Sequence, residues 1–362
     1  MADNVLAYGF IDYANLAASR VAEVGAEQIY TAIETSAKYH SDQLNNVLGK
    51  LCRRTTNFKW RYRLPQGGTL QPLDDKGKPL PTKGDTYYDV ALPIQRGGTG
   101  MGMTWLAAAK ATVQEVNSKV LGCLQQDADW MVRHALAAIF NNASWTYTDP
   151  EKGSLTIQPL AAADVTFPII GASSEASQHY MASASAIADA TNHYDTIYDQ
   201  LMKHPANQIA GKDVVCFIPT GLVATTKGLA DFVPVADPDI ATGANSDRIT
   251  AAQARIMGIQ GPGDEVLGKV GRTWVVEWKR LPAGYIIGVA LGNPDPVLGF
   301  REEPEASLQG LVTLRDGTAF TNETYFLRSA GFGVVNRIGA VVFRVGNGSY
   351  AIPTGYECPL AV

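Results

Sequence analysis

The stretch NFKWRYRL at residues 57–64 alternates strictly between large apolar and basic side chains. A strand places successive side chains on opposite faces, so one face of this stretch is aromatic and the other is basic. The stretch YDVALPI at residues 88–94 repeats the period of two. Residues 65–85 between them are rich in Pro, Gly, Lys and Asp, which is typical of a solvated turn region. The sequence therefore predicts a long two-stranded arm with an exposed tip.

The arm offers little apolar surface of its own to cover its aromatic face. A two-stranded hairpin is only marginally stable in isolation, and Pro93 in the return strand indicates an unpaired edge. We therefore expect the aromatic face to be covered from elsewhere. Its members are Phe58, Trp60 and Tyr62 with Tyr88 of the return strand, and the opposite, basic face holds Lys59, Arg61 and Arg63.

A long helical pattern follows the arm directly. Apolar residues recur at helical spacing from Leu106 to Ile139. One helix over 104–141 would be about 57 Å long at about 1.5 Å per residue. Residues 5–51 are also helical in periodicity, with a thin apolar face that Gly25 interrupts, and we expect an N-terminal arm that lies on another surface.

The rest of the chain predicts an α+β protein. Short strands are expected over 154–160 and 165–170, and a helix over 184–204 ending at Pro205. An alternating pattern follows, with strands at 213–219, 273–278 and 284–291 and helices at 222–232 and 249–257; strands dominate from 297 onward. This order is that of a second domain inserted into a first. The predicted divisions are 1–51 for the N-terminal arm, 52–103 for the extended two-stranded arm, 104–190 for the long helix and its domain, 191–295 for the insert, and 296–362 for the returning strands and C-terminal tail.

Composition excludes several classes of function for this protein. The chain has 362 residues, 46% hydrophobic and 18% charged, and a formal net charge of −5, which argues against a protein that binds phosphate backbones for affinity. Its four cysteines are far apart without metal-ligand spacing, so a reducing compartment is expected. The sequence shows no signal peptide and no apolar run of membrane-spanning length.

No pattern in the sequence points to catalysis. The glycine-rich stretch GGTGMGM at 97–103 fails both the dinucleotide and the P-loop spacing, so we expect a flexible hinge. The acidic loop around Asp237 and Asp247 fails the spacing of a calcium loop. The five histidines show no ligand spacing. We therefore expect no enzyme activity, no metal and no cofactor.

Three segments resemble a known family. FLRSAGFGVVNR at 326–337, GKVGRTW at 268–274 and LPAG at 281–284 are similar to the closing regions of tailed-phage major capsid proteins, which have the Hong Kong 97 type fold. The predicted arm and long helix match that family's order of elements. The resemblance implies an N-terminal arm, an extended β-hairpin loop, a long spine helix in a peripheral domain, and an inserted α/β axial domain.

The resemblance also implies a function. A family member is a structural subunit that assembles as hexamers and pentamers into an icosahedral shell around double-stranded DNA, held without sequence preference. Separate scaffolding and portal proteins, with decoration proteins as an option, would be its partners. The chain would reside in the virion capsid after assembly in the bacterial host cytoplasm. The aromatic face with Tyr88 would contact a neighbouring subunit, and the basic face would pair with acidic groups such as Glu302 and Glu303.

Two alternatives remain open. An encapsulin-type nanocompartment shares the fold but encloses an enzyme cargo. A protein of a different class, a small-molecule enzyme, would use the α/β insert around 213–291.

Overall fold

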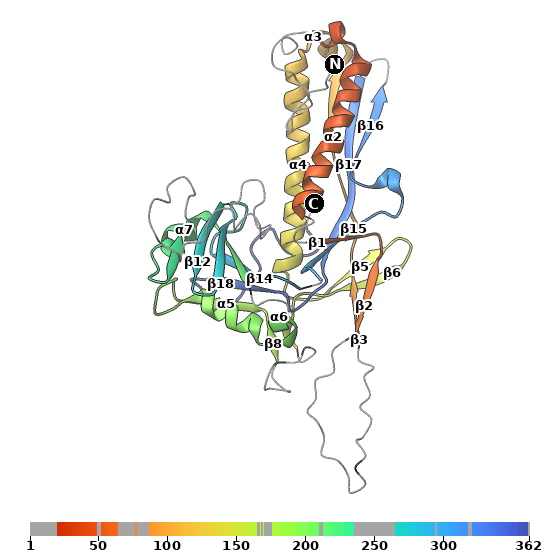
Figure 1. Cartoon of the computed structure of the whole chain (residues 1–362). Helices are drawn as coiled ribbons and strands as arrows, with labels where there is room; N and C mark the ends of the chain where they lie inside the picture. Colours follow the sequence, from red (N-terminus) through yellow and green to blue (C-terminus); the bar gives the residue numbers. More distant parts are fainter. Residues whose placement is uncertain are drawn as a thin grey trace.

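The computed structural model describes residues 20–48, 52–63, 77, 87–164, 167, 169, 176–209, 213–234, 265–293, 295–317 and 321–360. Figure 1 shows a tall unit in which helices stand beside long strands, and a second unit that flanks its base. We call the first the helix–sheet unit and the second the seven-stranded unit. The fold is mixed α+β, as the sequence predicts.

The helix–sheet unit is organised by its longest strand. Strand β17 (Thr321–Val334) pairs along one side with β4 (Gln95–Thr104). It also pairs antiparallel with β16 (Leu311–Gly317) and β15 (Leu298–Glu302), and β15 pairs parallel with β1 (Cys52–Thr55). Helix α4 (Val113–Phe140) packs on the face made by β4 and β17. One strand thus connects most of this unit.

The N-terminal helix packs on the same unit. Helix α1 (Val21–Val24) is followed by Gly25, whose φ of 97° favours glycine, and by α2 (Ala26–Leu48). Ile29, Ile33 and Ala37 of α2 are buried in one apolar cluster with residues of α4 and with Phe326 of β17. The sequence predicted both the helical period and the interruption at Gly25. The surface on which this N-terminal segment lies is formed by helix α4 and strand β17 of the same chain.

The single helix predicted over 104–141 is two helices. Helix α3 (Trp105–Lys110) ends at Ala111, which is extended with ψ 141°. Thr112 then caps α4: its side chain accepts from the backbone N–H of Glu115, and the Glu115 carboxylate accepts from the N–H of Thr112. This reciprocal cap begins a new helix and outweighs the continuous apolar pattern. Helix α4 has 28 residues and is therefore about 42 Å long.

The glycine-rich stretch predicted as a hinge is strand β4. Its glycines leave room for neighbouring side chains: a Cβ at Gly97 would lie 2.9 Å from the Trp130 ring, and one at Gly98 would lie 2.7 Å from Leu327 Cδ2. Glycine is therefore selected here for close packing within a sheet, which the spacing of glycines alone cannot distinguish from flexibility.

The seven-stranded unit contains the alternating α/β pattern. Its strand order is β11 (Phe232–Pro234), β12 (Glu265–Val270), β13 (Thr273–Glu277), β10 (Val214–Ile218), β14 (Tyr285–Ala290), β18 (Ala340–Val345) and β9 (Tyr180–Ser183). The strands β10, β13 and β14 are fully buried, as their continuous apolar runs predict. Strands β9 and β18 lie outside 191–295, so the predicted insert shares its sheet with flanking chain.

Several predicted elements have different bounds. Helix α5 (His193–Met202) begins at an Asn192 cap, and Pro205 starts a further short helix, α6 (Pro205–Ile209). The other described elements are α7 (Thr220–Lys227), the hairpin of β5 (Trp145–Asp149) and β6 (Gly153–Ile157), the pair β7 (Ala162–Asp164) and β8 (Ser177–Gln178), and a 3-10 turn (Ala306–Leu308). Three predicted features lie outside the described residues: the helix at 249–257, the acidic loop around Asp237 and Asp247, and most of the strand at 165–170.

We predict that Gly331→Ala strongly destabilises the subunit. A Cβ at Gly331 would lie 1.8 Å from the carbonyl oxygen of Pro93, so the backbone of β17 must move. We expect the free energy of unfolding, measured by denaturant titration, to fall by about 3 kcal/mol or more. Gly102→Ala in the same sheet is the control, because its new Cβ would meet Glu323 Cγ at an ordinary 3.5 Å. Equal stability of the two variants would contradict this packing.

Candidate inter-subunit surfaces

The two strands of the predicted arm are present, and their aromatic face is partly covered from within the subunit. The predicted tip at 65–85 lies outside the described residues apart from Gly77. Strands β2 (Lys59–Arg63) and β3 (Tyr87–Ala91) pair antiparallel, with Trp60 opposite Val90 and Tyr62 opposite Tyr88. The rings of Tyr62 and Tyr88 stack with centroids 5.3 Å apart. These aromatics and Trp60 are half-buried against a small cluster of Val90, Leu92 and Val335. Burial raises the pKa of the Tyr88 hydroxyl to about 12.

Phe58 leaves this face and packs elsewhere. It contacts the buried cluster of Ala91, Leu155 and Ile157, which includes the β6 strand. Part of the aromatic face is therefore covered within the subunit. Its cover comes from Val335, which follows β17 and lies far away in the sequence. Contact of the remaining exposed part with a neighbour stays a prediction.

The basic face of the arm has a carboxylate within the arm. Lys59 Nζ and Arg61 Nε lie 2.6 and 2.8 Å from the carboxylate of Asp89. Hydrogen bonds from Arg61 and then Lys59 lower the pKa of Asp89 to about 2. The Arg61 guanidinium also lies 4.1 Å from the ring centroid of Tyr87, which is 55% exposed. Arg63 ends β2 opposite Tyr87 in the register, and its side chain lies outside the described residues.

Glu302 and Glu303, predicted to meet the basic face of a neighbour, have partners within the chain. Glu302 is buried, accepts from Arg54 and accepts from the N–H of Gly310 at 3.1 Å. Glu303 accepts from Arg96 at 3.3 Å and from the Ser329 hydroxyl at 2.8 Å. Neither carboxylate needs a second subunit for neutralisation, and the predicted pairing between subunits remains untested.

A buried ion pair fixes the base of the arm. Arg301 Nη1 donates to the carboxylate of Asp149 at 2.9 Å and to the carbonyl oxygen of Leu92 at 2.8 Å. The side chains of Arg301 and Asp149 are 7% and 5% exposed. The β5–β6 hairpin, strand β15 and the start of the arm therefore meet at one guanidinium.

Sequence analysis missed an exposed surface on the sheet of the helix–sheet unit. Residues opposite one another in an antiparallel sheet share a face, so Leu314 opposite Tyr325 and Asp316 opposite Glu323 lie together. Leu314, Tyr325 and Leu327 are 49%, 38% and 40% exposed. We call this the outer face and define it by Leu314, Asp316, Glu323, Tyr325 and Leu327, with Gly98, Gly100 and Gly102 of β4 beside them.

The opposite face of the same strands contains a buried charge network. Arg328 Nε and Nη2 donate to the carboxylate of Asp127 at 2.5 and 2.7 Å. His40 Nε2 lies 3.1 Å from the same carboxylate, and Arg328 Nη2 lies 3.3 Å from the Ser41 hydroxyl. Burial opposes ionisation of Asp127, but the hydrogen bonds from His40 and Arg328 outweigh it and lower its pKa. A period-two pattern in ETYFLRS (323–329) was the available signal, although it does not reveal which face is buried.

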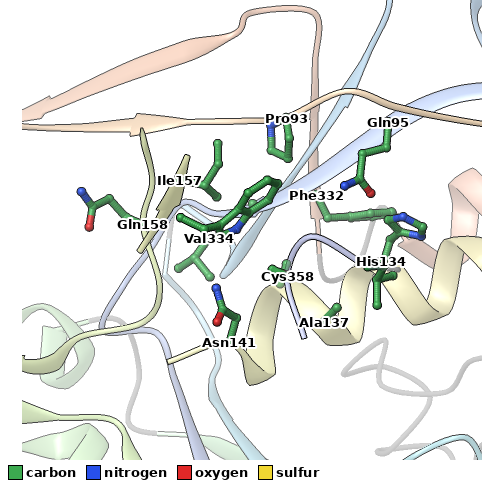
Figure 2. Close-up of a pocket in the computed structure, with 14 residues that line it drawn as sticks. Pro93, Gln95, His134, Ala137, Asn141, Ile157, Gln158, Phe332, Val334 and Cys358 are labelled. Carbon is green, nitrogen blue, oxygen red and sulfur yellow. The ribbon is translucent and has the colours of Figure 1, made fainter. Parts of the chain in front are cut away.

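A small-molecule site requires ligating side chains or a pocket. The described residues include no group of three or more His, Cys, Asp or Glu side chains placed to hold a metal ion. Figure 2 shows a pocket between β4, the end of α4 and the C-terminal segment, lined by His134 and Cys358 among others. Its volume of about 20 Å³ suits a single water.

Within the described part of the chain, no helix has the length and apolar character needed to span a bilayer.

Comparison with known proteins identifies the class of fold. No family model and no curated protein matches the sequence. A solved structure from Mycobacterium phage Patience matches with TM-score 0.69 and 18% identity, covering 96% of both chains. The asymmetric unit of the bacteriophage PhiM1 mature capsid matches with TM-score 0.51 and 12% identity, over 82% of this chain and 86% of that chain.

This chain therefore has the fold of a phage capsid protein, as its sequence resemblance indicated. An encapsulin complex from Synechococcus elongatus also matches, with TM-score 0.41 and 11% identity over 83% of this chain and 86% of that chain. At that score the likeness supports no conclusion.

We predict an acid-sensitive subunit, because the seven-stranded unit contains a neutral histidine. His179 is fully buried, with Nδ1 2.6 Å from the carbonyl oxygen of Ala340 and Nε2 3.0 Å from His204 Nε2. Burial, with the nearby His204, lowers the pKa of His179 to about 3. The unfolded chain binds this proton near pH 6.5, so stability is present above that pH and decreases below it. We expect a loss of about 2 kcal/mol between pH 7.5 and pH 5.

Denaturant titration of the subunit at the two pH values measures this loss. His179→Asn keeps a donor toward Ala340 but does not titrate, so its stability should differ less between the two pH values. An unchanged pH dependence in this variant would contradict the assignment to His179.

Proposed function

We propose that this chain is a major capsid protein of a tailed bacteriophage and assembles into an icosahedral shell enclosing double-stranded DNA. The fold shared with the phage structures supports this proposal. The outer face also supports the proposal, because its leucine and tyrosine side chains are half exposed on one sheet face. Contiguous exposed apolar side chains mark surfaces that bind another protein.

The charges of the outer face also favour a partner. Asp316 and Glu323 lie directly opposite one another, and like charges in that position repel. Among the described residues, neither forms an ion pair with a Lys or Arg, and the Glu323 carboxylate accepts from the Tyr325 hydroxyl within the subunit. A basic segment with apolar side chains would relieve this repulsion and cover Leu314 and Leu327. The arm of a neighbouring subunit is a candidate for this segment, because its exposed side carries Tyr87 and two cations, Lys59 and Arg61, that share the single carboxylate of Asp89.

In this proposal the Hong Kong 97 type features have specific counterparts. Helix α4 is the spine helix, β2–β3 is the extended loop, α2 belongs to the N-terminal arm and the seven-stranded unit is the axial domain. Subunits would form hexamers and pentamers with separate scaffolding and portal proteins, in the host cytoplasm, before becoming the virion capsid. The role is structural and requires no cofactor.

We predict that Leu314→Ser with Leu327→Ser impairs shell formation while leaving the subunit folded. Both side chains are already about half exposed, so their loss removes interface area rather than core. We expect the concentration needed for assembly to increase at least about tenfold, equivalent to about 1.4 kcal/mol. Light scattering and electron microscopy measure assembly, and circular dichroism confirms folding.

The matched control is Leu106→Ser with Leu308→Ser. These leucines are 50% and 42% exposed and lie on α3 and the 3-10 turn, outside the strands whose side chains define the outer face. The control should assemble like the unmodified chain. Normal assembly of the Leu314/Leu327 variant would show that the outer face is not an interface, and a wild-type chain that forms no shell even with its scaffold would contradict the proposed function.

We also predict weak DNA binding by the isolated subunit. With a net charge of −5, the chain releases few counterions from a DNA duplex. Fluorescence anisotropy should show binding without sequence preference and with a shallow dependence on salt between about 50 and 200 mM. Tight binding with a steep salt dependence would indicate that the subunit binds the DNA phosphates directly, contrary to this prediction.

A further inference from the structure

A cavity lies between helix α4 and the inner face of the sheet, which is the face opposite the outer face. Its volume is about 140 Å³, and its walls come from β4, α4, β16 and β17. Figure 1 shows α4 standing beside β17, on which it packs. A cavity of about 150 Å³ in another protein binds benzene. The cavity of this chain therefore has room for a molecule of similar size.

One side of the cavity is reached from solvent and the other is buried. Gly98 of β4 and Gln126 of α4 are exposed, whereas Phe326 and Arg328 of β17 are buried. Gly97 lies opposite Arg328 in the register of β4 and β17. Opposite residues share a face of the sheet, so no side chain of β4 occupies the space beside the Arg328 guanidinium.

The wall of the cavity is mostly apolar. Trp130 of α4, Leu311 of β16 and Phe326 of β17 line it. Phe326 is 1% exposed and belongs with Leu311 to the apolar cluster between α4, α2 and the sheet. An apolar molecular body is therefore favoured over water along most of this surface.

Arg328 supplies an unused hydrogen-bond donor. Its side chain is 2% exposed, and its Nε and Nη2 donate to the carboxylate of Asp127. Within the described part of the chain, its buried Nη1 has no hydrogen-bond partner. A buried N–H without an acceptor is destabilising, so a ligand that brings an acceptor gains this hydrogen bond. Asp127 already balances the charge of Arg328, and an uncharged acceptor is therefore sufficient.

We propose that this cavity binds a small uncharged molecule, about the size of a cyclohexane ring, that carries a carbonyl or hydroxyl oxygen. The oxygen accepts from Arg328 Nη1, and the ring packs against Trp130, Leu311 and Phe326. Such a ligand contacts α4 and the sheet together, so its binding stabilises the folded subunit. The proposal does not depend on shell formation, because every wall of the cavity belongs to one subunit.

Two probes of nearly equal shape test the hydrogen bond. Cyclohexanone has the required carbonyl, and methylenecyclohexane has a CH₂ group in place of the oxygen. Ligand-observed NMR titration of the full chain measures both affinities. We expect cyclohexanone to bind at least about tenfold more tightly, because methylenecyclohexane leaves Arg328 Nη1 unpaired. An equal or reversed order, which a purely apolar cavity would give, would overturn the role of Arg328.

Two neighbouring glutamines of α4 provide a matched pair of variants. Gln125 and Gln126 are both exposed, and only Gln126 lines the cavity. Gln126→Phe should obstruct the cavity and weaken cyclohexanone binding at least about tenfold. Gln125→Phe should bind cyclohexanone like the unmodified chain, and circular dichroism verifies that both variants are folded. Equal affinities of the two variants would show that the probe binds elsewhere and would overturn the site.

A structure of the chain saturated with cyclohexanone locates the oxygen atom. We expect this oxygen within about 3.2 Å of Arg328 Nη1. Absence of saturable binding, or a structure in which water alone contacts Arg328 Nη1, would overturn the proposal and leave the proposed capsid function unaffected.

Discussion

The buried pair of Arg328 and Asp127 determines how the helix–sheet unit is assembled. Arg328 lies on the face of β17 that packs against α4, where an unpaired charge would be very costly. Asp127 of α4 meets it with two hydrogen bonds, and His40 and Ser41 of α2 complete the network. Breaking such a pair typically costs about 3–5 kcal/mol. Strand, long helix and N-terminal helix are thereby fixed in one arrangement, on which the surfaces of the unit depend.

Close backbone packing gives this arrangement its second constraint. Gly97 allows the Trp130 ring to approach β4, and Gly331 allows the backbone of β17 to touch that of Pro93. Arg301 then joins the base of the arm to β15 and the β5–β6 hairpin.

The same constraints leave specific groups unsatisfied in a single subunit. The buried face of β17 takes Phe326 and Arg328, which forces Tyr325 and Leu327 to the exposed outer face. The glycines of β4 admit these side chains, and β4 pairs with β17 alone among the described strands. The network that holds Arg328 leaves its Nη1 without a hydrogen-bond partner among the described residues. These three features lie on one sheet.

The sequence by itself determined the elements that depend on local pattern. Alternation fixed the arm strands around Trp60, continuous apolar runs fixed β10 and β14, and Gly25 marked the break before α2, because these follow from periodicity and backbone freedom. Tertiary structure decided which faces are buried and whether the glycines of 97–102 provide flexibility or close packing. Val335 covers the aromatic side chains of the arm. Asp127 neutralises Arg328 and so allows it to face the core. Pairing with β17 makes the predicted hinge at 97–103 part of strand β4. Each of these depends on residues distant in sequence, whose approach no local pattern encodes.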